Sequence, residues 1–236
     1  MNTEKLQKEL LERQISMQKE INCKDIETKE NIHTVAGVDL AYWSDDSGSE
    51  QAVCCIVLID YQTHEIIETQ SYSDKVQYPY MPGFLAFREL PLVLETVKLL
   101  QHKPDIYIFD GNGYLHPRHM GIATHASLYL NTPTIGIAKT YYKVDNTDYT
   151  EPENKRGSYT DIVINGEVYG RVLRTMADVK PVFVSIGNCI SLDTATEIAI
   201  NLTSKESHIP VPTRYADLET HRMRKILHEK QYNLIT

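Results

Sequence analysis

Residues 105–140 read DIYIFDGNGYLHPRHMGIATHASLYLNTPTIGIAKT. The apolar run Ile106–Phe109 leads into Asp110 and a Gly-Asn-Gly turn, a pattern typical of a buried strand that ends at the acid. We therefore expect Asp110 at the carboxyl end of a strand, His116 in the following loop and Lys139 at the end of the next apolar run. A fixed carboxylate beside glycine backbone suits a hard cation; the alternative is an Asp that only begins a turn.

The composition indicates one globular domain spanning 1–236, because 42% of the 236 residues are hydrophobic and 24% are charged. The longest apolar run, Ala52–Ile59, is far shorter than the roughly 20 residues that a membrane helix needs. The amino terminus, MNTEKLQKELLERQ, is charged from the start and does not read as a signal peptide. We expect a cytoplasmic protein without membrane contact.

Net charge and cysteine spacing narrow the functional class of the protein further. A net charge of -8 argues against a protein that coats duplex nucleic acid electrostatically. It does not exclude a nuclease, because acidic residues can serve as metal ligands. The four cysteines show no metal-binding spacing, and we expect them to be reduced core residues, with Cys54 and Cys55 facing opposite sides of a strand.

Hydrophobic periodicity predicts alternating strands and helices. Helices are expected over residues 4–21, 84–102, 120–130, 191–204 and 215–230. Strands are expected over residues 34–41, 51–60, 65–71, 106–109, 134–138, 161–164, 167–173 and 182–186. Pro91 should kink its helix or restart it, and Asn165-Gly166 indicates a hairpin. The order predicts an α/β fold: a mixed sheet, with an antiparallel three-strand meander plus parallel strands, flanked by helices.

Asp39 is an acid inside an otherwise apolar first strand. Burying it unpaired would cost several kcal/mol, so it needs a cation or a hydrogen-bond partner. If the strand that ends at Asp110 pairs beside this first strand, the two carboxylates come together. Like charges raise each other's pKa unless a divalent ion neutralises them. Oxygen ligands without cysteine favour magnesium or manganese over zinc.

Two further acids stand near the starts of helices. Glu89 follows the meander at the start of the next helix. Asp217 lies near the start of the last helix, where a favourable interaction with the helix dipole is the alternative to a role in a site.

Together these segments resemble the ribonuclease-H-like nucleases, and within them they are similar to the endonuclease V family, repair nucleases specific for deoxyinosine. The resemblance runs from Asp39 to Asp217. It rests on six short motifs in the same order: Gly37-Val-Asp39, Pro79-Tyr-Met-Pro-Gly-Phe84, Phe87-Arg-Glu89, Asp110-Gly-Asn-Gly-Tyr-Leu-His116, Pro133-Thr-Ile-Gly-Ile-Ala-Lys139 and Pro212-Thr-Arg-Tyr-Ala-Asp217.

The resemblance implies roles for particular residues. The implied catalytic set is Asp39, Glu89, Asp110, His116, Lys139 and Asp217. Asp39 and Asp110 would hold Mg²⁺, with Mn²⁺ as a substitute, and Glu89 would assist directly or through water. Whether one ion or two bind is open. His116 and Lys139 would lie beside the scissile phosphate, and Asp217 would complete the acidic shell. The alternatives are an imidazole hydrogen-bonded to backbone for His116 and a solvated strand-end lysine for Lys139.

The resemblance also implies a substrate-binding side. Tyr80, in a loop stiffened by two prolines, would wedge into the duplex with Met81 beside it, while the lesion base turns out into a pocket. The alternative for Tyr80 is packing on the following helix. Backbone groups around Gly83, Gly111 and Gly113 would read the edge of hypoxanthine, which presents O6 as an acceptor and N1–H as a donor.

The function implied by the resemblance is hydrolysis of a phosphodiester bond on the 3′ side of deoxyinosine in DNA, leaving 5′-phosphate and 3′-hydroxyl. The expected partner of this monomer is DNA containing deoxyinosine. Inosine-containing RNA is the alternative, because Asn112 stands where both His and Asn occur in the family. A non-catalytic inosine-binding module remains another option. An actin-like ATPase of the same fold ranks low, because the chain lacks a second phosphate-binding repeat.

Overall fold

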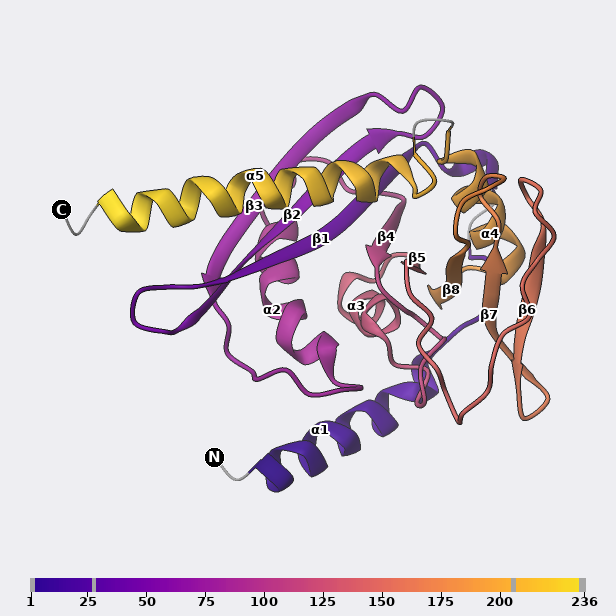
Figure 1. The fold of residues 1–236 in the computed structure, drawn as a ribbon, viewed down its shortest axis with the longest axis horizontal. Coiled ribbons are helices and arrows are strands. Elements are labelled where there is room, and N and C mark those ends of the chain that lie inside the picture. Colours follow the sequence, from indigo (N-terminus) through magenta and orange to yellow (C-terminus); the bar gives the residue numbers. More distant parts are fainter. Residues whose placement is uncertain (1–2, 27–28, 205–206, 234–236) are drawn as a thin grey trace.

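One mixed sheet runs through the computed structural model, which describes residues 3–26, 29–204 and 207–233 (Figure 1). Its eight strands lie in the order β3-β2-β1-β4-β5-β8-β7-β6. The strands are β1 Thr34–Ser44, β2 Glu50–Asp60, β3 Ile66–Lys75, β4 Ile106–Asp110, β5 Thr134–Ala138, β6 Tyr159–Ile164, β7 Glu167–Leu173 and β8 Val182–Asn188.

The helices cover both faces of this sheet. They are α1 Thr3–Met17, α2 Leu85–Val97, α3 Ile122–Leu130, α4 Leu192–Asn201 and α5 Val211–Asn233, with short 3₁₀ turns at Gln18–Glu20 and Lys29–Asn31. α2 and α3 pack on one face through the apolar cluster that includes Phe109 and Val93. α4 and α5 pack on the other face through a second cluster, centred on Ile108 and Ile198. This two-sided packing confirms the expected α/β class.

Strand pairing follows the predicted mixture and extends it. β1, β2 and β3 form the expected antiparallel meander. β4 pairs parallel to β1 and β5 pairs parallel to β4. Beyond β5 the pairing returns to antiparallel, because β8 runs against β5 and the β6–β7 hairpin extends that edge. The parallel strands therefore lie in the middle of the sheet, where both faces are covered.

α5 lies across β1 at a position where only glycine fits (Figure 1). A Cβ on Gly37 would stand 2.1 Å from the backbone carbon of Pro212, so the helix start and the strand touch directly. The helix begins at Val211, not at Tyr215 as predicted, because a proline in the first turn has no helical hydrogen bond to lose. Asp217 consequently lies in the second turn, one turn deeper than expected.

α2 continues through Pro91 from Leu85 to Val97, so of the two alternatives for this proline the restart is excluded and the kink stays a prediction.

The prediction for the cysteines needs correction in part. All four cysteines are free, and Cys54 and Cys55 are buried in separate apolar clusters on opposite faces, as predicted. Cys23 is exposed and Cys189 only half-buried, so the core prediction is wrong for these two, which lie outside regular strands and helices.

Candidate functional site

Asp39 and Asp110 lie side by side at the point where β4 ends. β1 and β4 pair in parallel with Val38 opposite Phe109, so the next residue on each strand is an acid. β1 continues past this point, whereas β4 stops at Asp110. The expected pairing of the two strands is confirmed, and both carboxylates stand at the edge of the apolar core.

The carboxylate of Asp39 is held by a residue of α5. Thr220 is buried, and its hydroxyl lies 2.9 Å from Oδ2 of Asp39 and 2.8 Å from the carbonyl oxygen of Asp217. Burial raises the pKa of Asp39 to about 6, the Thr220 hydrogen bond opposes this rise, and the charges of Asp110 and Asp217 add to it. Asp39 therefore carries a proton more readily than an ordinary carboxylate.

Glu89 reaches the same place from α2. Its carboxylate is buried and accepts a hydrogen bond of 2.7 Å from the hydroxyl of Tyr42. Burial raises the pKa of Glu89 to about 7, and the charges of Asp39 and Asp110 contribute in the same direction. Near neutral pH the carboxyl of Glu89 is thus close to half-protonated and that of Asp39 keeps a smaller protonated fraction, which leaves both responsive to an added positive charge.

Lys139 supplies the positive charge that touches the acids. Its Nζ lies 2.6 Å from Oδ2 of Asp110 and 3.9 Å from Oδ1 of Asp217. Burial lowers the pKa of Lys139, but the hydrogen bond and charge of Asp110 outweigh it and the net shift is upward. Lys139 is partly exposed yet paired with two carboxylates, so the solvated-lysine alternative does not describe it.

Four acids from four separate elements therefore surround one point of the sheet edge: Asp39, Glu89, Asp110 and Asp217. Within the described ranges, no three His, Cys, Asp or Glu side chains are already arranged as a metal-binding group. The donor chemistry nevertheless fits a hard divalent cation, because the donors are carboxylate oxygens, and burial together with neighbouring negative charge raises the pKa values of Asp39 and Glu89.

His116 has a different environment from the one expected for a catalytic imidazole. Nδ1 accepts hydrogen bonds from the backbone N–H groups of Arg118 (3.2 Å) and Met120 (3.3 Å), so Nε2 carries the proton and donates to the carbonyl of Gly83 at 3.1 Å. Burial lowers the pKa of His116 to about 3, and the charge of Arg118 adds to this effect. The ring is therefore neutral and bonded to backbone, as in the alternative considered from the sequence. A catalytic role for His116 stays a prediction.

The loop that carries Tyr80 borders a small pocket. Tyr80 is 66% exposed, which excludes the alternative of packing as a core residue. The pocket has a volume of about 110 Å³, and Tyr80, Asn112 and Tyr142 contribute to its lining. The side-chain oxygen Oδ1 of Asn112 is buried and has no hydrogen-bond partner among the residues that the structure describes. Met81 instead packs against the apolar cluster formed around Leu10, so it faces α1 and not the pocket.

The three glycines predicted to bind substrate have unequal positions. Gly83 lines the pocket and has φ of +78°, a conformation that glycine adopts easily. Gly113 is packed against β8, where a Cβ would stand 2.1 Å from the carbonyl oxygen of Ile186. Its N–H donates to Ser185 and its carbonyl accepts from Gly121. Gly111 lies against Ile122, outside the pocket lining. Substrate contacts by Gly111 and Gly113 stay predictions.

Comparison with known proteins agrees with this geometry. The profile of the Endonuclease V family matches residues 15–218. The chain belongs to the endonuclease V family. Endonuclease V from Bacillus thuringiensis subsp. konkukian is 61% identical over 200 residues, which cover 85% of each chain. Membership in this family identifies the chain as a nuclease.

Solved endonuclease V structures share the fold. The crystal structure of the Bacillus subtilis protein has a TM-score of 0.92 and 50% identity, covering 98% of this chain and 95% of that one. Endonuclease V of Ciona intestinalis, in complex with a 24mer DNA containing an inosine followed by a ribo-adenosine, has a TM-score of 0.85 and 27% identity. That match covers 95% of this chain and 100% of the Ciona chain.

Several residues that support the endonuclease V site escaped the sequence analysis. Thr220 follows Asp217 by three residues on a helix, so the two share a face, and this spacing could have revealed it. Gln14 continues the apolar stripe of Leu6 and Leu10 at helical spacing, which indicates a buried position, and the structure shows it completely buried. A buried amide side chain needs a hydrogen-bond partner, so this spacing could have revealed Gln14. Tyr42 gave no such signal, because its contact with Glu89 depends on tertiary packing.

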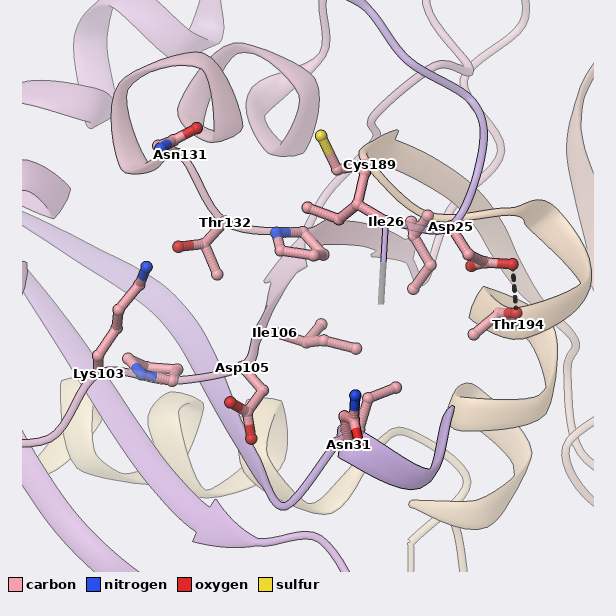
Figure 2. Close-up of a pocket in the computed structure, with 14 residues that line it drawn as sticks. Asp25, Ile26, Asn31, Lys103, Asp105, Ile106, Asn131, Thr132, Cys189 and Thr194 are labelled. Carbon is pink, nitrogen blue, oxygen red and sulfur yellow. Dashed lines mark hydrogen bonds between the residues drawn. The ribbon is translucent and has the colours of Figure 1, made fainter. Parts of the chain in front are cut away.

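A separate pocket of about 310 Å³ lies at the other end of the parallel strands of this endonuclease V fold (Figure 2). Ile106 and Asp105 line it at the start of β4, whereas Asp110 closes that strand at its far end. Figure 2 shows the carboxylate of Asp25 hydrogen-bonded to Thr194, at 3.0 Å. Because the candidate acids Asp39 and Asp110 do not line this pocket and Asp110 ends β4 at its other end, the pocket is not part of the candidate site.

Proposed function

We propose that the chain hydrolyses a phosphodiester bond on the 3′ side of deoxyinosine in DNA, leaving 5′-phosphate and 3′-hydroxyl ends. The observation that carries this proposal is the meeting of three carboxylates, Asp39, Glu89 and Asp110, with Lys139 in contact with Asp110. Burial raises the pKa values of Asp39 and Glu89. The Tyr80 pocket is lined by residues close in sequence to Glu89 and Asp110. The inosine-containing DNA bound by the Ciona relative supports the choice of lesion.

Magnesium, or manganese in its place, is the cofactor in this proposal. Asp39 and Asp110 would hold the ion, with Glu89 assisting directly or through water. A bound divalent ion polarises a phosphoryl oxygen and lowers the pKa of water, so that hydroxide is available at neutral pH.

Lys139 acts on the phosphate in this proposal, and Asp217 completes the acidic shell. The ammonium group of Lys139 is held between Asp110 and Asp217, so its direction is fixed before substrate arrives. A positive charge at this place stabilises the negative charge that develops on the phosphate oxygens. Exchange of the Asp110 contact for a phosphate contact requires only a short movement of Nζ. His116 can join the reaction only if its hydrogen bond to Gly83 opens.

The Tyr80 pocket receives the extruded base in this proposal. Tyr80 is exposed on a loop with prolines on both sides, which suits a ring that stacks in place of the displaced base. Asn112 offers an acceptor without a partner, and hypoxanthine offers N1–H, a donor that adenine lacks at that position. Pairing the two would remove the unfavourable state of a buried, unsatisfied amide oxygen.

The matching experiment uses oligonucleotides of one sequence that carry a deoxyinosine, an inosine or an adenosine at one position, with and without magnesium. The proposal expects magnesium-dependent cleavage on the 3′ side of deoxyinosine, with product ends identified by ligation and phosphatase sensitivity. Preferential cleavage of the RNA substrate would favour the inosine-specific ribonuclease instead. Binding of deoxyinosine without cleavage under any divalent cation would overturn the proposal in favour of the binding module. Mass measurement in solution tests the expected monomer.

A further inference from the structure

A groove separates the end of β1 from the second half of α5. It has a volume of about 320 Å³, and none of its lining residues is shared with the Tyr80 pocket. The lining residues are Tyr42, Trp43, Arg224, Lys225, His228 and Glu229. No role in the proposed reaction has been given to this groove so far.

Both walls of the groove connect to the acidic cluster. On the β1 side, Tyr42 lines the groove and donates its hydroxyl hydrogen bond to Glu89 at 2.7 Å. On the α5 side, Nε2 of His221 lies 3.7 Å from Asp217, and Nδ1 of the same ring lies 3.1 Å from Nη2 of Arg224. The groove therefore lies next to the catalytic acids, connected to Glu89 through Tyr42 and to Asp217 through His221.

The chemistry of the groove suits a nucleic-acid strand. Arg224 and Lys225 bring two permanent positive charges, opposed by the single carboxylate of Glu229, on a chain with a net charge of -8. Trp43, like Met223 and Leu227 of α5, packs against the buried cluster of Ala41, Val53 and Cys55, and it remains partly exposed in the groove. Positive charge along a groove with an aromatic ring is the combination that binds single strands without sequence preference, through phosphate contacts and base stacking.

We infer that this groove binds the nucleotides 3′ of the scissile bond, with phosphates against Arg224 and Lys225 and a base against Trp43. The inference rests on the proposed function, because the Tyr80 pocket takes the lesion and the acids cut on its 3′ side. The strand that leaves the acids on that side then continues over the surface that Tyr42 and His221 connect to them.

Trp43 provides a direct measurement, because it is the only tryptophan of the chain. Single-stranded DNA with one deoxyinosine and a 3′ arm of about 12 nucleotides, the scale of a single-strand site, should quench or shift its fluorescence when bound without divalent cation. The same oligonucleotide with its 3′ arm cut to about two nucleotides should bind without this change, whereas shortening the 5′ arm should preserve it. Equal changes with both 3′ arms, or dependence on the 5′ arm, would overturn the inference.

Charge removal provides an independent measurement. Arg224→Gln combined with Lys225→Gln should weaken binding of the long-arm DNA roughly tenfold at 0.2 M salt and flatten the slope of log affinity against log salt by about 1.4, about 0.7 for each lost phosphate contact. Arg222→Gln is the matched control, because Arg222 lies on the same helix, pairs with Glu219 and does not line the groove. An unchanged slope in the double variant, or an equal loss in the control, would contradict the groove assignment.

These results separate the groove from the proposed function. Replacing deoxyinosine with deoxyadenosine in the long-arm DNA tests lesion preference alone. If that preference is absent while the Trp43 signal still follows the 3′ arm, the groove stands and the lesion specificity fails. If deoxyinosine is cut while the Trp43 signal ignores the arm, the lesion specificity stands and the groove assignment fails.

Discussion

The carbonyl oxygen of Gly83 lies 2.7 Å from Nη2 of Arg118, at the base of the loop that carries Tyr80. The same oxygen accepts hydrogen bonds from Nε2 of Gln14 and Nε2 of His116, both at 3.1 Å. Arg118 in turn donates to Gln14 at 2.6 Å. One carbonyl therefore ties the exposed tyrosine loop to α1 and to the loop after β4.

This arrangement predicts that Gln14, although distant from the acids, supports substrate binding. Gln14→Ala removes one of the three donors to the Gly83 carbonyl and the acceptor of Arg118 Nε, and it should cost about 1–3 kcal/mol of unfolding free energy. Binding to duplex DNA containing deoxyinosine should weaken as well, because the Tyr80 loop loses an anchor. Arg13→Ala, the exposed neighbour that pairs with Glu9, should change stability by less than about 0.5 kcal/mol. Thermal melts and binding curves that do not distinguish the two variants would disprove this role.

Tyr80 should matter for binding and little for stability. Because its ring is 66% exposed, Tyr80→Ala should change unfolding free energy by less than about 0.5 kcal/mol. Binding to duplex containing deoxyinosine should weaken by roughly 1–3 kcal/mol, the usual worth of a base–aromatic stack. The loss should shrink on single strands, where less stacking is broken to extrude the base. The wedge assignment would be wrong if Tyr80→Ala lowered the unfolding free energy by about the 3–5 kcal/mol of a core aromatic and weakened binding to duplex and to single strands equally.

Asp110→Asn should abolish cleavage and leave lesion binding measurable, because the carboxylate supplies the charge that a divalent cation needs. Asp39→Asn should behave in the same way. The two losses should not add in the double variant, since both act through one cation-binding group. Turnover assays and gel-shift binding test this together. Normal turnover of Asp110→Asn at saturating magnesium would remove Asp110 from the mechanism.

Glu89 should make stability depend on pH in a defined direction. Its pKa of about 7 in the folded protein exceeds its ordinary value of 4.5, so the folded state holds the proton more tightly than the unfolded state. The stabilisation is complete below about pH 4.5 and is lost as the pH rises to about 7. Comparison with Glu89→Gln removes this titration together with its charge coupling to Asp39 and Asp110.

Denaturant titrations across this range should show the stability of the wild type falling relative to Glu89→Gln as the pH rises. Glu95→Gln, an exposed position on the same helix that pairs with Lys98, controls for the loss of one negative charge from α2. A constant difference between wild type and Glu89→Gln across the range would show that the carboxyl group is not held protonated by its surroundings.

Magnesium should stabilise the folded protein more at pH 8 than at pH 5, because the carboxyls of Asp39 and Glu89, with pKa values of about 6 and 7, must ionise to hold it. Melting curves with magnesium and with a chelator measure this shift. Asp110→Asn should lose most of it. A shift of equal size in that variant would place the ion elsewhere on the protein.

The sequence allowed the adjacency of Asp39 and Asp110 to be predicted, because each acid interrupts or ends an apolar strand and parallel strands align such positions. Lys139 was predictable for the same reason, at the end of β5. His116 shows the limit of this reasoning. Its hydrogen bond to Gly83 joins residues 33 positions apart, and no local pattern indicates which backbone carbonyl a loop histidine will meet.

Helix boundaries near prolines were the weakest part of the prediction. Pro91 stays inside α2, although an interior proline usually ends or restarts a helix. Pro212 stands in the first turn of α5, where Gly37 lets the helix touch β1. Only at Pro91 does the helix continue against the local preference of proline. Pro212 follows that preference, and the earlier start of α5 places Asp217 in its second turn.

The position of α5 in the chain, after the strands and helix that carry the other acids, sets the order in which the nuclease site is built. Asp39, Glu89 and Asp110 precede α5 in the chain, but Asp217 and Thr220 arrive only with that helix. During synthesis from the amino terminus, a nascent chain already contains three of the acids while the helix that orients Asp39 is still inside the ribosome. The site is therefore completed last, and a ribosome-bound chain that lacks α5 carries its acids without the partner that holds Asp39 in place.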